Sequence, residues 1–123
     1  MRLNKHLITG TFATALLLSC QTYAAECEAP ATPEVPAGAT ATLEEMIAGQ
    51  KSVKAFQADA QMFRQCVEGK LEGLKAAAAE GDEEAAEAFK NTTDAYNASV
   101  AAEEKLAEDF NTEIRAYKEA NPS

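Results

Sequence analysis

Two long stretches of this sequence, residues 42–79 and 83–120, carry apolar side chains every three or four positions. That spacing is typical of a helix with one apolar face. The first stripe consists of Met46, Val53, Phe56, Ala60, Phe63, Val67 and Leu74. The second consists of Phe89, Tyr96, Val100, Ala107, Phe110, Ile114 and Tyr117. Gly81 and Asp82 lie between the stripes, where glycine can end one helix and aspartate can cap the next. We therefore expect two helices joined by a short turn.

The two stripes match each other in register. If the chain turns at Gly81–Asp82, residues that face each other should have position numbers with a constant sum, here 163. The pairs with this sum are Met46/Tyr117, Gly49/Ile114, Val53/Phe110, Phe56/Ala107, Phe63/Val100, Val67/Tyr96 and Leu74/Phe89. Large residues tend to face small ones, as interlocking layers require. The pattern predicts an all-α fold, an antiparallel two-helix hairpin.

Glu103 interrupts the second stripe, opposite Ala60. Arg64 lies one turn along the first helix and is within reach of Glu103 across the seam. We expect a partly exposed interhelical ion pair, worth about 0–1 kcal/mol. The alternative is that Glu103 is a polar contact point for a partner.

The beginning of the first helix has a local signal, and its end is less certain. Thr42 and Glu45 have the spacing of a capping box. Gly69 and Gly73 could break the helix, since each costs about 1 kcal/mol relative to alanine in a helix interior. The alanine run at 76–79 favours continuation.

Residues 25–41 contain three prolines and many small residues, which predicts an extended arm. The arm carries Cys27, and the first helix carries Cys66. Cys66 lies 24 residues beyond Thr42, about 36 Å along a helix. The 15 residues from Cys27 to Thr42 reach about 46 Å when extended. We expect the arm to run back along the first helix and to end in a Cys27–Cys66 disulfide, the alternative being two free thiols.

Residues 1–24 have the pattern of an export signal. Arg2 and Lys5 precede an apolar run from Leu7 to Leu18, and Ala24 is a suitable cleavage position. A second interpretation is a lipobox ending at Cys20, which would lipidate that cysteine. The first predicts a periplasmic or secreted protein. The second predicts an outer-membrane lipoprotein, the one case in which we expect contact with a membrane.

Charge and residue types restrict the possible functions. Twenty acidic against 11 basic side chains give a net charge of −9, which disfavours nucleic-acid binding. The single histidine, His6, lies in the signal segment, so the mature chain has no imidazole for catalysis or metal binding. Cleavage after residue 24 leaves nine basic against 20 acidic side chains, a net charge of −11. We expect no catalytic, metal or cofactor site.

Several segments resemble those of other proteins. Cys27-Glu28-Ala29-Pro30, Val35-Pro36-Ala37-Gly38 and Cys66 resemble a group of short, exported helical proteins of proteobacteria with no established activity. The resemblance covers nearly all of the mature chain and implies export, helices and a disulfide. Tyr96-Asn97 with Val100 is similar to part of the LemA family of envelope-associated helical proteins.

The expected function is therefore a non-enzymatic role through protein–protein contacts in the cell envelope. The alternative is a holdase-like or lipid- or peptide-binding module that uses the apolar groove of the hairpin. Four large apolar residues lie off the stripes: Ile47, Met62, Leu71 and Leu106. Three roles are open for them: to underlie the arm, to complete a four-helix dimer, or to receive another partner.

Overall fold

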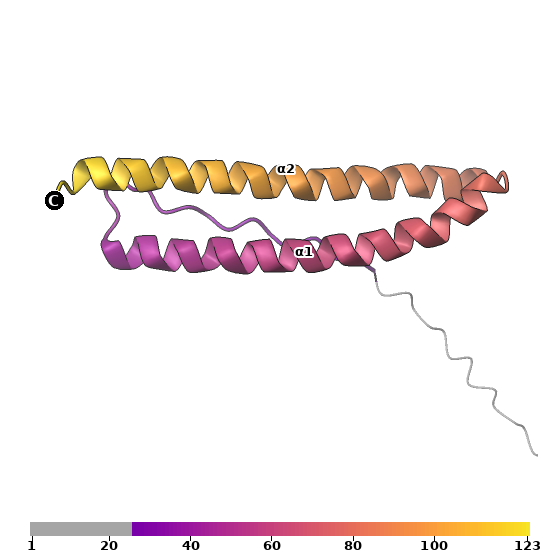
Figure 1. The fold of residues 1–123 in the computed structure, drawn as a ribbon, viewed down its shortest axis with the longest axis horizontal. Helices are drawn as coiled ribbons and strands as arrows, with labels where there is room; N and C mark the ends of the chain where they lie inside the picture. The colour runs from indigo at the N-terminus through magenta and orange to yellow at the C-terminus, as the bar shows by residue number, and fades with distance from the viewer. Residues whose placement is uncertain (1–25) are drawn as a thin grey trace, which may run out of the picture.

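A computed structural model describes residues 26–123. Helix α1 spans Leu43–Ala79 and helix α2 spans Glu83–Ala120. The two helices lie side by side and antiparallel, so the predicted helical hairpin is confirmed (Figure 1). Within the described residues, neither helix is apolar enough over a sufficient length to cross a membrane. The expected signal segment 1–24 and Cys20 lie outside the described residues.

Local signals determine the helix ends. The Thr42 hydroxyl accepts a hydrogen bond from the Glu45 N–H at 3.2 Å, and Glu45 Oε2 accepts one from the Thr42 N–H at 2.7 Å. This is the predicted capping box. At the turn, Gly81 has a φ of 94°, a conformation that glycine adopts without steric cost. Asp82 Oδ1 then accepts a hydrogen bond from the Ala85 N–H at 3.0 Å and caps α2.

Helix α1 is continuous through Gly69 and Gly73, as the alanine run predicted. Its buried residues follow the predicted stripe, with Leu74 half-buried near the turn. They are Met46, Gly49, Val53, Phe56, Ala60, Phe63 and Val67. Their regular alternation of three and four positions is the heptad spacing of a coiled-coil seam. The predicted apolar face of α1 is therefore confirmed from Met46 to Val67.

Helix α2 is rotated relative to the predicted stripe. Its buried residues are Ala85, Ser99, Leu106 and Phe110. Of the seven predicted stripe residues, only Phe110 is buried, and the other six are half-buried. Leu106, which we placed off the stripe, is only 2% exposed. The stripe on this helix is therefore confirmed only in part: Ile114 and Tyr117 pack against the core half-buried, whereas Leu106, one of the residues left open to underlie the arm, is more deeply buried than any residue of that stripe.

The arm is the third packing element of the fold. From Cys27 it runs along the two helices toward the start of α1 (Figure 1). Val35 packs against the central core cluster, and the Pro36 ring lies over Gly49, where a Cβ would be 2.7 Å from Pro36 Cδ. The Gly38 N–H donates a hydrogen bond to Glu113 Oε2 at 2.7 Å. The arm therefore packs along the groove between the two helices, on the side where α2 presents Leu106, and it covers that side chain.

Candidate functional site

The predicted disulfide joins the arm to the middle of α1. Cys27 and Cys66 are bonded, with their Cα atoms 5.8 Å apart and a sequence separation of 39. Cys66 is exposed and Cys27 is partly exposed. The bond ties the arm to α1 close to the first described residue, Glu26. Cys20, the possible lipidation site, lies outside the described residues.

The structure also brings Arg64 and Glu103 together. Arg64 Nη1 lies 2.7 Å from Glu103 Oε2, and the two side chains are 17% and 26% exposed. Arg64 Nη1 also donates a hydrogen bond to Ser99 Oγ at 3.3 Å. We did not expect Ser99 to take part. The available signal was that Ser99 precedes Glu103 by four positions and so lies on the same face of the helix. The three residues form a small polar cluster in an otherwise apolar seam.

The turn end of the hairpin is packed less tightly than the end that the arm covers. No residue is buried between Val67 on α1 and Ala85 on α2. Leu71, Leu74 and Phe89 are half-buried there. Among the described residues, 26–123, only the two helices contribute side chains to this region. We call it the turn-end groove.

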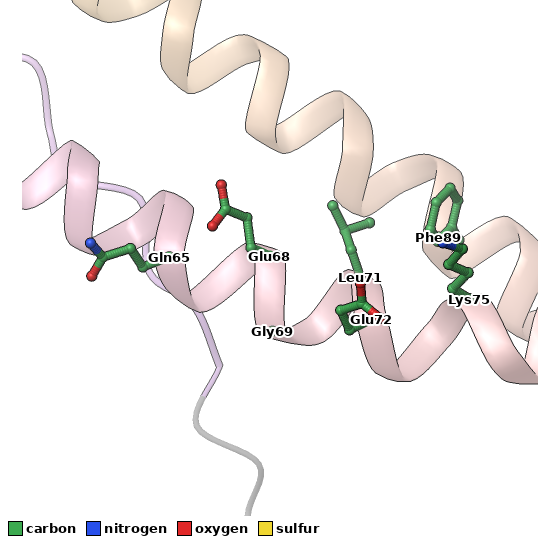
Figure 2. Close-up of a pocket in the computed structure, with 7 residues that line it drawn as sticks. All are labelled: Gln65, Glu68, Gly69, Leu71, Glu72, Lys75 and Phe89. Atoms are coloured by element: carbon green, nitrogen blue, oxygen red, sulfur yellow. The ribbon is translucent and has the colours of Figure 1, made fainter.

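A cavity of about 650 Å³ lies in the turn-end groove. Figure 2 shows Leu71 of α1 extending toward α2, with Phe89 of α2 nearby. Four polar side chains lie around these two apolar groups. They are Gln65, Glu68, Glu72 and Lys75. A Cβ added at Gly69 or Gly73 would find no atom within 4 Å, so the α1 backbone is open to solvent at both positions.

The groove is acidic. Residues 68–94 contain eight acidic and three basic side chains. Two of the acidic residues, Glu68 and Glu72, line the cavity itself. Among the described residues, no group of three or more histidine, cysteine or acidic side chains is arranged to hold a metal ion. Carboxylates therefore outnumber ammonium groups in this region, and Lys75 is the basic residue that lines the cavity.

The four off-stripe residues have different environments. Leu106 is buried beneath the arm, and Leu71 is half-buried in the turn-end groove. Met62 borders the arm but is 59% exposed. Ile47 is 45% exposed and lines a smaller apolar cavity, of about 270 Å³, at the open end of the hairpin. Of the three roles that the sequence left open, the structure assigns Leu106 to the arm.

Among the described residues, two ionisable groups have shifted pKa values, and both lie at the surface. Hydrogen bonds from the Thr42 backbone N–H and hydroxyl lower the pKa of Glu45. The Asp109 carboxylate, 2.6 Å from Lys105 Nζ, raises the pKa of that ammonium. The first shift reflects helix capping and the second a pair of residues four apart on one helix. Neither has the pattern of a catalytic acid or base in a cleft.

Comparison with known proteins identifies no relative. No protein-family model, no curated protein and no solved structure matches this chain.

Proposed function

We propose that the mature chain is a non-enzymatic protein of the bacterial envelope that acts through contacts with another protein, and that the turn-end groove is the contact surface. Export rests on the signal pattern of residues 1–24, with ordinary cleavage after Ala24. Lipidation at Cys20 is the alternative route and would tether the same hairpin to a membrane.

The open apolar cavity at Leu71 and Phe89 is the observation that carries this proposal. Protein contact surfaces commonly combine a small apolar centre with a polar rim that excludes water. Here the rim includes Glu68 and Glu72, and the neighbouring turn adds more carboxylates. The best-fitting partner presents one large apolar side chain between basic residues, because opposite charge favours encounter and register.

The second candidate is a holdase-like or peptide- or lipid-binding module. Its natural site would be the long groove between the helices, but Val35 and Pro36 of the arm occupy part of that groove. The turn-end groove is open in the same structure. This difference favours contacts at the turn end over capture of a chain or lipid along the seam.

Photocrosslinking in native envelopes tests the proposal. A photoreactive phenylalanine analogue replaces Leu71 in one variant and Lys54, an exposed residue on the arm-covered half of α1, in the control. We expect a discrete adduct from position 71 only. Its yield should fall as salt rises, because the rim is charged. Equal labelling from both positions, or none from position 71, would contradict the proposal. An adduct of twice the chain mass would instead indicate a four-helix dimer.

The intact mass of the native protein tests the location. A chain that begins at Ala25 in the soluble envelope fraction supports ordinary export. A lipidated chain that begins at Cys20 in the membrane fraction supports the lipoprotein alternative.

A further inference from the structure

The arm is attached to the hairpin at two separate places. One is the Cys27–Cys66 disulfide. The other is the segment 35–38, which packs Val35 against the core and donates the Gly38 N–H to Glu113. Between them, no hydrogen bond of the described structure joins residues 28–34 to either helix. Residues 26–34, which we call the strap, are therefore held at one end by a covalent bond and at the other by the 35–38 anchor.

The strap lies beside two buried side chains of the core. Residues 26–31 line a cavity together with Phe63, and residues 32–34, with Val35 of the anchor, line a second one together with Leu106. Phe63 is 7% exposed and Leu106 is 2% exposed. Moving the strap away would open the groove beside both side chains to water.

The disulfide can be reached from solution. Cys66 is exposed, and both cysteines border a cavity of about 440 Å³ between the strap and α1. An attacking thiolate needs access to one of the two sulfur atoms. The position of Cys66 at the surface of α1 provides that access without any unfolding of the helix.

We propose that the strap is a reduction-sensitive cover: reducing Cys27–Cys66 releases residues 26–34 and uncovers the groove, while the 35–38 anchor and both helices stay in place. A dithiol reductant supplies the two electrons. Its thiolate attacks Cys66 Sγ, and Cys27 Sγ leaves and takes up a proton. The second thiol of the reductant then displaces the Cys66 sulfur, which also becomes a thiol, and the reductant is left as a disulfide.

Backbone NMR of the full mature chain tests the proposal, with dithiothreitol as the reductant. On reduction, the heteronuclear NOE of amides in 28–34 should fall to the level of a flexible chain, whereas the values for 38–42 stay unchanged. A soluble paramagnetic agent should broaden the Phe63 ring signals more in the reduced protein, because the arm residues that border Phe63 all belong to the strap. The far-UV circular dichroism should keep its helical amplitude. The Cys27→Ser/Cys66→Ser variant should show the released state with or without reductant.

Two results would overturn the proposal. Unchanged NOE values in 28–34 after complete reduction would show that packing alone holds the strap. Loss of helical signal together with new mobility at 38–42 would show that the disulfide holds the whole fold. The double-serine variant excludes an effect of the reductant on anything other than the two cysteines.

Discussion

Truncating Leu106 tests the packing feature that the sequence stripe missed. The side chain is 2% exposed, and Leu→Ala removes three carbons. At about 0.8 kcal/mol per buried carbon, the lost transfer free energy is about 2.4 kcal/mol. The cavity that remains adds to this, so we expect Leu106→Ala to lower the free energy of unfolding by about 3–4 kcal/mol, within the usual range of 2–5 for such changes.

The matched control is Leu43→Ala, because Leu43 is 60% exposed and the chemical change is the same. We expect it to cost less than about 1 kcal/mol. Urea unfolding, followed by circular dichroism and fitted with one common m-value, compares the unfolding free energies of the two variants. If Leu106→Ala costs no more than Leu43→Ala, Leu106 is not buried beneath the arm and our account of the rotation of α2 is wrong.

Three further predictions follow from the same structure. The Cys27→Ser/Cys66→Ser variant should lose about 4 kcal/mol of unfolding free energy in the chain-entropy model, since the bond spans 39 positions; a loss below about 1 kcal/mol in urea unfolding would contradict that model. Gly38→Ala should destabilise the protein by about 1–3 kcal/mol, because the new Cβ overlaps the Glu113 carbonyl. Gly69→Ala should stabilise it by about 0.5–1 kcal/mol, because its new Cβ meets open space. In thermal unfolding, the two variants should shift the Tm in opposite directions. Hydrogen bonds from Thr42 lower the pKa of Glu45 in the folded protein. The contribution of the Glu45 carboxylate to stability is therefore present above the ordinary glutamate pKa and is lost as the pH falls through the folded pKa. The difference in unfolding free energy between wild type and Glu45→Gln should vanish at acidic pH, and a difference that persists there would contradict this assignment.

The polar cluster in the seam was predictable in part from residue types and spacing, and the turn-end groove was not. Arg64 and Glu103 are both charged residues at seam positions of facing helices, so their contact follows from the register of the hairpin. The part played by Ser99 was less evident, because a serine among small residues on a helix does not by itself indicate a buried hydrogen bond. The turn-end cavity needs the side chains of both helices and the endpoint of the arm, which no single pattern contains.

The sequence alone determined the two helices, their ends and the buried face of α1. These depend on local information: the capping box at Thr42 and Glu45, the turn at Gly81, and a heptad repeat that does not change when the helix packs. It also predicted the disulfide, because the extended arm is long enough to bring Cys27 back to Cys66. Only the tertiary structure decided which flank of α2 is buried. Partly apolar side chains lie on both flanks of α2, and the arm covers the flank that contains Leu106: residues 32–35 lie beside it, and the Gly38 N–H donates to Glu113 further along the same helix.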